Sequence, residues 1–222
     1  MKFLITAGPT REPIDPVRFI SNRSSGKMGY AIAEAALAEG HDVTLISGPV
    51  SLEAPRDARL ILVSTGDEMF EAVHQHVHEC DICVLCAAVA DYKPATISPT
   101  KIKKRAEKFL LELVRTRDIL DSLGHKQGRQ FVLVGFAAET DHVEENAAKK
   151  LRAKNCDVIV ANDVSDTNSG MESDMNEMTI LFRDGEKKRI SRAPKKIIAR
   201  ELVKIFLSFA TKVFDKKKVM IN

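Results

Sequence analysis

The stretch Asp81-Ile82-Cys83-Val84-Leu85-Cys86-Ala87-Ala88 decides the fold, because from Ile82 onward it is apolar without interruption. A strand with two apolar faces is typical of a parallel sheet that is covered by helices on both sides. Outward from it, short apolar strands alternate with segments of helical periodicity. The strands are predicted at 3–5, 43–46, 60–63, 81–88, 131–136 and 157–161, and the helices at 26–39, 68–79 and 140–154. This order predicts an α/β fold with a doubly wound, mostly parallel, Rossmann-like sheet.

The C-terminal part of the sequence follows a different pattern. Two segments at 178–183 and 187–190 flank Asp184-Gly185-Glu186, which is typical of a hairpin turn. A helix with one apolar face is predicted at 194–214, followed by a solvated tail at 215–218. Because no repeat or interdomain linker interrupts the chain, we expect residues 1–222 to form a single domain with a C-terminal β-hairpin and helix.

The composition of the 222 residues excludes several classes of protein. With 44% hydrophobic and 29% charged residues, the chain is neither disordered, collagen-like nor a coiled coil. Its longest apolar run, 82–90, is too short to cross a membrane. A net charge of +3 is too small to indicate nucleic-acid binding. The N-terminus lacks the layout of a signal peptide, and four cysteines without one predict reduced thiols in a cytoplasmic protein.

Two segments at predicted strand ends look like ligand sites, since open α/β sheets bind ligands there. The connection 7–25 is much longer than a usual βα loop and meets a predicted helix at Ser24-Ser25-Gly26. Helix N-termini favour anions, and Arg18 and Lys27 would add positive charge. The alternative is a serine cap followed by glycines for close packing, because the Gly-x-x-Gly spacing matches neither common phosphate-binding motif.

The second segment follows the strand at 81–88. Small residues there would let a flat ligand approach the backbone, and Asp91 could hold Mg²⁺ through water. The run Lys101-Ile102-Lys103-Lys104 could meet a triphosphate, although such a run also suits a solvated surface.

These segments together resemble a known family. The runs 5–29, 87–92, 101–104, 135–140 and 161–164 are similar, in order and over essentially the whole chain, to phosphopantothenoylcysteine synthetase. In many bacteria that enzyme is the C-terminal half of a bifunctional coenzyme A biosynthesis protein. The flavin-dependent decarboxylase half has no counterpart in this sequence, so we expect no flavin, and a separate decarboxylase is a candidate partner.

The resemblance implies a ligase of the coenzyme A pathway that works in two steps. The carboxylate of 4′-phosphopantothenate attacks the α-phosphorus of CTP to form an acyl-cytidylate and pyrophosphate. The amine of cysteine then displaces CMP. The resemblance also implies Mg²⁺ on the phosphates, without direct protein ligation, and a homodimer. The hairpin 178–190, an unpaired sheet edge by sequence, supports that oligomeric state.

Site residues follow from the resemblance by position. It implies catalytic roles for Asn22 and for Lys101, the latter on the triphosphate. It places Arg18 at phosphopantothenate, with Gly8, Ser24, Ser25, Gly26, Ala87 and Ala88 also contacting substrate. The nucleotide-binding positions are Asp91, Lys101, Thr116, Asp118, Ile119, Phe136, Lys150 and Lys154, with Asn162 and Asp163 as secondary positions. Arg117 stands where the family pattern has proline. This departure lies in the loop that reads the base, so it bears on the choice between CTP and another nucleotide.

Three other constellations have simpler interpretations. Cys80, Cys83 and Cys86 have metal-ligand spacing, but in a strand side chains three apart point to opposite faces, so we interpret them as buried apolar residues. The three histidines at 74, 76 and 78 fit an exposed helix without a third ligand. The run 175–178 resembles a decarboxylase motif but is better explained as the start of the hairpin.

Two rival functions stay open on the residues alone. A Rossmann-type oxidoreductase fits the fold and Tyr92-Lys93, but the Tyr-x3-Lys and Gly-x-Gly-x-x-Gly spacings are missing. A non-catalytic nucleotide sensor would keep the pocket, yet it would not need both Asn22 and Lys101.

Overall fold

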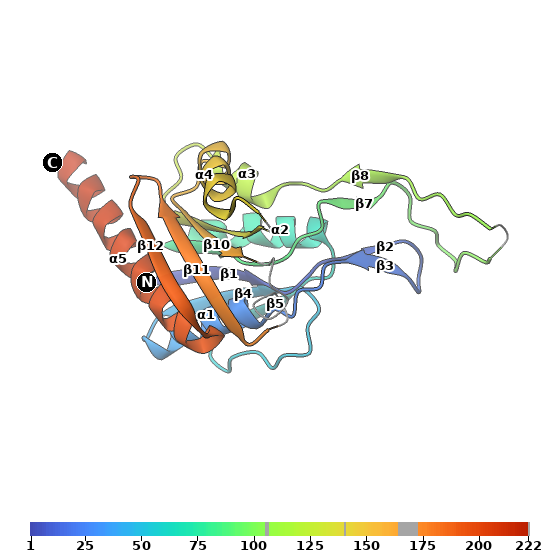
Figure 1. Cartoon of the computed structure of the whole chain (residues 1–222), viewed down its shortest axis with the longest axis horizontal. Coiled ribbons are helices and arrows are strands. Elements are labelled where there is room, and N and C mark those ends of the chain that lie inside the picture. The colour runs from blue at the N-terminus through green and yellow to red at the C-terminus, as the bar shows by residue number, and fades with distance from the viewer. Residues whose placement is uncertain (105–106, 140, 164–172, 222) are drawn as a thin grey trace.

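The computed structural model describes residues 1–222 except 105–106, 140, 164–172 and 222. Its centre is an eight-stranded sheet in the order β12-β11-β10-β9-β6-β1-β4-β5 (Figure 1). The six strands from β10 to β5 run parallel to one another. Strand β11 pairs antiparallel with β10, and β12 pairs antiparallel with β11. The parallel strands are β1 (Lys2–Ala7), β4 (Asp42–Ser47), β5 (Arg59–Leu62), β6 (Ile82–Leu85), β9 (Val132–Glu139) and β10 (Val158–Asp163). The predicted fold class is confirmed.

Helices cover both faces of the sheet, as the wholly buried β6 requires. One face packs on α1 (Lys27–Ala38) and α5 (Lys195–Ile221) through a core that includes Phe3, Ile5 and Phe206. The other face packs on α2 (Gly66–His76), α3 (Ile119–Gly124) and α4 (Val143–Ala153). A 3-10 turn, Val77–Glu79, follows α2. Because successive side chains of β1 alternate between the two cores, a single strand joins both layers.

The C-terminal hairpin is confirmed and is longer than predicted. Strands β11 (Met175–Phe182) and β12 (Lys187–Pro194) flank the turn, and β11 pairs with β10, so β12 is the one of these two strands that lies at an edge of the sheet. Met175 begins the hairpin, as expected. The predicted end of the last helix at 214 is wrong, because α5 continues to Ile221, although Asp215 and Lys216 are exposed, as expected for a solvated segment. The lysines there lack the apolar spacing used to find the helix, but lysine is itself a good helix former.

The long connection at 7–25 contains a small hairpin that the sequence did not predict. Strands β2 (Arg11–Pro13) and β3 (Phe19–Ser21) pair with each other, and β7 (Tyr92–Pro94) pairs with β8 (Leu113–Arg115). Figure 1 shows both pairs extending away from the sheet on the same side, with the segment between β7 and β8 extending farthest. We call these two projections the arms. Among the described residues, no helix has the length and apolar character needed to cross a membrane.

Candidate functional site

The site lies where the strands β1 and β6 end, and backbone contacts join the two segments that the sequence singled out. The Ala88 amide donates to the Gly8 carbonyl at 2.9 Å, and the Asn22 side-chain amide donates to the Ala88 carbonyl at 3.0 Å. Thr6 and Thr10 accept from the amides of Ala87 and Ala90 with their hydroxyl oxygens. Asn22 is therefore held directly against the small residues at 87–88, as a shared site requires.

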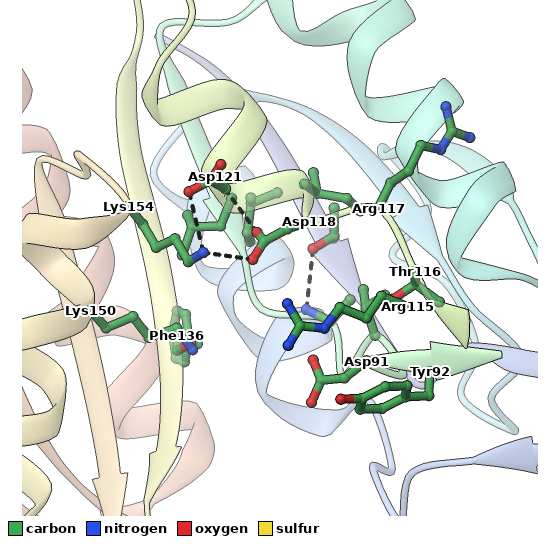
Figure 2. Close-up of a pocket in the computed structure, with 16 residues that line it drawn as sticks. Asp91, Tyr92, Arg115, Thr116, Arg117, Asp118, Asp121, Phe136, Lys150 and Lys154 are labelled. Atoms are coloured by element: carbon green, nitrogen blue, oxygen red, sulfur yellow. Dashed lines mark hydrogen bonds and ion pairs between the residues drawn. The ribbon is translucent and has the colours of Figure 1, made fainter. Parts of the chain in front are cut away.

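The larger cavity, of about 630 Å³, contains the predicted nucleotide residues other than Lys101. Its wall includes Asp91, Thr116, Asp118, Ile119, Phe136, Lys150 and Lys154, which come from β9, α3, α4 and the segment around β8 (Figure 2). Residues far apart in the sequence thus meet in one place. The volume is in the range of pockets that hold a cofactor-sized molecule.

An ion-pair cluster at one end of the larger cavity consists of Asp118, Asp121 and Lys154. The Lys154 ammonium lies 2.9 Å from an Asp118 carboxylate oxygen and 3.2 Å from one of Asp121. Asp118 also caps α3 by accepting from the Asp121 amide at 2.8 Å. These contacts lower the pKa of Asp118 despite its burial and raise the pKa of Lys154. Lys150 donates to the Phe136 carbonyl at 3.1 Å, so both lysines are positioned before a ligand binds.

Arg117, the departure from the family pattern, points away from the cavity toward α2 (Figure 2). Its guanidinium contacts Glu71 at 2.6 Å and Asp67 at 3.2 Å, and it lies 4.0 Å above the ring of Phe70. These contacts raise the pKa of Arg117. The arginine therefore fixes the loop by binding α2, where a proline would fix it through its ring.

A smaller cavity, of about 290 Å³, adjoins the larger one and shares Ala87, Val89, Asp91, Phe136 and Lys150 with it. Of the predicted substrate residues, it is lined by Asn22, Ser24, Gly26, Ala87 and Ala88. Gly26 begins α1 with a φ of 77°, a left-handed conformation that favours glycine, and its amide donates to the Ser24 hydroxyl at 3.3 Å. No side-chain hydrogen bond from the N-cap residue closes the start of α1, and the first turn of that helix, at 27–29, lines this cavity.

Arg18 and Lys101 lie on the arms and line neither cavity of their own chain. Arg18 donates to the buried Asp15 carboxylate and, at 3.0 Å, to the Ile102 carbonyl, while the Ile102 amide donates to Asp15. The Arg18 guanidinium holds the pKa of Asp15 well below its usual range. This cluster joins the two arms and fixes the chain next to Lys101. Gly8 and Ser25 also lie outside the two cavity walls.

Several wall residues have no counterpart in the sequence analysis. Tyr92, Arg115 and Asp121 line the larger cavity, and Asn176 and Lys195 line the smaller one, as does Asn162, a secondary position. Arg115 lies in a three-residue strand that is too short to give a periodic signal. Asn176 and Lys195 come from the hairpin and the last helix, which the sequence assigned only to structure.

The metal-like patterns do not form a metal site in the described part of the chain, where no three His, Cys, Asp or Glu residues cluster suitably. Cys83 packs in one core and Cys86 against the other, as expected for opposite faces of a strand. Burial raises the pKa of Cys86 to about 12. The prediction of an exposed histidine helix is partly wrong: His74 stacks on Phe70 with ring centroids 4.0 Å apart and contacts Ser122 at 3.2 Å.

Asp91 is the residue that could hold Mg²⁺ in the site. Its carboxylate lines both cavities and points into the larger one (Figure 2). Within the described ranges, no lysine, arginine or histidine forms an ion pair with it, in contrast to Asp118 and Asp121 nearby. An exposed carboxylate of this kind suits a hydrated Mg²⁺ that carries most of its own water ligands.

Known proteins resemble this chain closely. The Coenzyme A biosynthesis bifunctional protein CoaBC of Bacillus subtilis (strain 168) is 51% identical over 201 residues, which are 90% of this chain and 49% of that protein. The chain thus spans about half the length of the curated relatives it matches. The crystal structure of a CoaBC C-terminal domain is 44% identical, covers 96% of both chains and has a TM-score of 0.80. A Cab2 mutant in complex with phosphopantothenate-cysteine, 18% identical with a TM-score of 0.78 over 98% of this chain and 88% of its own, shares the fold.

One family description accounts for nearly the whole chain. It is the DNA/pantothenate metabolism flavoprotein C-terminal domain, and it matches residues 1–209. The match contains every strand of the sheet and both cavity walls. The chain belongs to this family.

Proposed function

We propose that this chain is a phosphopantothenate–cysteine ligase that uses CTP and forms an acyl-cytidylate intermediate. The observation that carries the proposal is the pair of joined cavities, with the nucleotide residues around the larger one and Asn22 beside their shared wall. A ligase of this type must hold a nucleotide and an acyl group next to each other, and two connected cavities meet that need. Members of the same family named CoaBC function in coenzyme A biosynthesis, which fits this assignment.

The first step joins a carboxylate to a nucleotide that is itself anionic, so positive charge has to lie around the phosphates. Lys150 and Lys154 supply it from α4, and the first turn of α1 supplies amide donors at the smaller cavity. Mg²⁺ bound near Asp91 would neutralise the departing pyrophosphate. Holding both reactants in line supplies a further part of the rate, about 7–11 kcal/mol in favourable cases.

In the second step the amine of cysteine attacks the acyl carbon, the carbon–oxygen bond to CMP breaks, and the amine loses a proton. Asn22 is positioned by Ala88 to donate hydrogen bonds to oxygens of the intermediate. As a neutral amide, it stabilises that mixed anhydride without adding negative charge.

We further propose a homodimer whose contact is formed by the arms. They expose large apolar side chains, of which Phe109 is 58% and Leu110 93% exposed, together with Val17, Phe19 and Ile97. Contiguous apolar surface of this kind marks interaction sites in most proteins. In such a dimer, the arms of one chain would bring their Arg18 and Lys101 to the cavities of the other chain. Light scattering at assay concentration tests this directly, and a monomer mass would refute it.

The test of the function is release of pyrophosphate with Mg²⁺, 4′-phosphopantothenate and cysteine, comparing CTP with ATP. We expect release with CTP that depends on phosphopantothenate, and formation of CMP and phosphopantothenoylcysteine. Release with neither nucleotide would support the nucleotide-sensor alternative. The four free cysteines fit a reducing, cytoplasmic location, where a separate decarboxylase would be the partner that takes the product.

A further inference from the structure

The smaller cavity has a wall that the proposed mechanism leaves unused. Together with Asn22, it is lined by Asn162 at the end of β10, Asn176 near the start of β11 and Lys195 at the start of α5. All three are polar and buried, with exposed fractions of 8%, 2% and 6%. Polar side chains that are this deeply buried usually satisfy one another or a ligand.

Asn162 carries the first specific signal. Its side-chain oxygen is buried and accepts no hydrogen bond from the described residues, whereas Asn176 accepts from the Glu177 amide at 3.0 Å. Leaving a buried acceptor unsatisfied costs about 1–3 kcal/mol. Because the residue faces a cavity beside Asn22, a ligand with an N–H group would supply the missing donor.

Lys195 carries the second signal. Its backbone amide donates to the Asp174 carbonyl at 2.9 Å, which fixes the residue at the cavity wall. Burial lowers the pKa of its ammonium, and the charge of Lys27, which lines the same cavity, lowers it further. Lys27 contacts the Asp174 carboxylate at 2.6 Å. The Asp174 carboxylate offsets part of this positive charge, and an anionic group in the cavity would offset more of it.

A ligand that needs both features carries an amine and a carboxylate on neighbouring atoms. A fully ionised phosphate group has only acceptor oxygens and would face the Asn162 oxygen unfavourably. An α-amino acid offers an N–H donor for Asn162 and a carboxylate for Lys195 at the same time. Its amine would lie on the side of the cavity that also contains Asn22.

We propose that Asn162 and Lys195 form the binding site for the amino-acid substrate of the ligase, with Asn162 accepting from its amine and Lys195 binding its carboxylate. This inference rests on the proposed function. The hydrogen bond to Asn162 orients the amine so that its lone pair can form the C–N bond. The acyl C–O bond breaks at the same time, and CMP leaves with the electron pair of that C–O bond. The proton released from the amine passes to solvent.

Substrate comparison tests the two roles separately. Cysteamine has the amine and thiol of cysteine without the carboxylate. In the full chain, Lys195→Gln should raise KM for cysteine about tenfold or more while KM for cysteamine changes little, so the preference for cysteine is lost. Asn162→Ala should raise KM for both amines alike, because both use the same nitrogen. Lys195→Arg should restore part of the preference.

The control is Lys196→Gln, which removes the neighbouring charge on an exposed side chain that pairs with Glu34 at 3.4 Å. It should retain wild-type kinetics. Pyrophosphate release with CTP and phosphopantothenate, without cysteine, reports the first step alone. Loss of that release in Lys195→Gln would assign the lysine to the triphosphate and overturn the proposal, as would an unchanged preference for cysteine in a folded variant. A wild-type chain without any ligase activity would overturn the proposed function itself.

Discussion

At the scale of single residues, substitution of Asn22 should separate the two steps of the proposed reaction. Its amide nitrogen donates to the Ala88 carbonyl. In Asn22→Asp this donor becomes a carboxylate oxygen, which repels both that carbonyl and the phosphate oxygens of the intermediate. We expect pyrophosphate release to be largely retained and amide formation to slow at least about tenfold. Rapid-quench measurement of both steps checks this, with Arg23→Gln as the neighbouring control; equal losses would contradict the role.

Two thiols with raised pKa values, the half-buried Cys86 and the buried Cys156, give a prediction about pH. Burial raises the pKa of Cys86 and of Cys156 to about 12, so neither is a thiolate near neutrality. Alkylation by iodoacetamide at pH 8 should therefore be slow at both sites in the folded protein and fast after unfolding. Its rate should rise about tenfold per pH unit up to the raised pKa, as long as the fold persists. Mass spectrometry of labelled peptides measures it, and rapid labelling of native Cys86 at pH 8 would show that its surroundings are wetter than the structure implies.

At the scale of elements, the contact between α1 and β1 positions the first turn of the helix at the smaller cavity. A Cβ atom at Gly29 would lie 2.6 Å from the Ala7 Cβ and 3.1 Å from the Thr6 carbonyl oxygen. Gly29→Ala should therefore push α1 from the strand and lower the free energy of unfolding by about 1–3 kcal/mol. Urea denaturation measures this loss. An unchanged or increased stability would mean that the two elements adjust without strain, since alanine favours a helix more than glycine does.

The interpretation of the glycines was partly open in the sequence. A Gly-x-x-Gly spacing suits both an anion site and close packing, and the structure gives the two glycines different surroundings. Gly29 is required by packing against Ala7, whereas Gly26 adopts a positive φ at the helix start beside the cavity. Spacing alone could not separate them, because the distinction depends on what lies across from each residue.

At the scale of the whole molecule, the proposed dimer would complete the site of each chain with Lys101 from the partner's arm. Lys101 lies on an arm, outside both cavities of its own chain, while Asn22 lines one of them. If the arm serves the partner, a mixture of Lys101→Gln and Asn22→Asp chains should contain hybrid dimers with one intact site. Activity should then recover to about a quarter of the wild-type value, because half of the dimers are hybrids and half of their sites are intact.

The comparison requires both variants to be inactive when they are alone. The wild-type chain mixed with either variant controls for subunit exchange. Absence of recovery in a sample in which exchange is demonstrated would mean that Lys101 serves the cavity of its own chain, through movement of the arm.

The sequence by itself determined the local features of this protein. The alternating apolar strands, the amphipathic helices and the C-terminal hairpin were predicted, because burial of a strand or helix face leaves a period in the sequence. The residues proposed to bind the nucleotide came instead from the family resemblance, and the structure gathers all of them but Lys101 around the larger cavity. The prediction was weakest where elements are short. Strands β2, β3, β7 and β8 have three residues each, which is too few for a period to be detected.

Only the tertiary structure decided which distant residues meet. In the fold, Arg117 contacts α2, and Arg18 contacts Asp15 and Ile102 on the arms. Asn162 and Lys195 line one cavity. Each of these contacts depends on the order of strands in the sheet and on the direction of the connections. Strand order and connection direction leave no local pattern in the residues involved. The physical reason is that periodicity reports which face of an element is buried, while the partner that buries it is chosen by the packing of the whole chain.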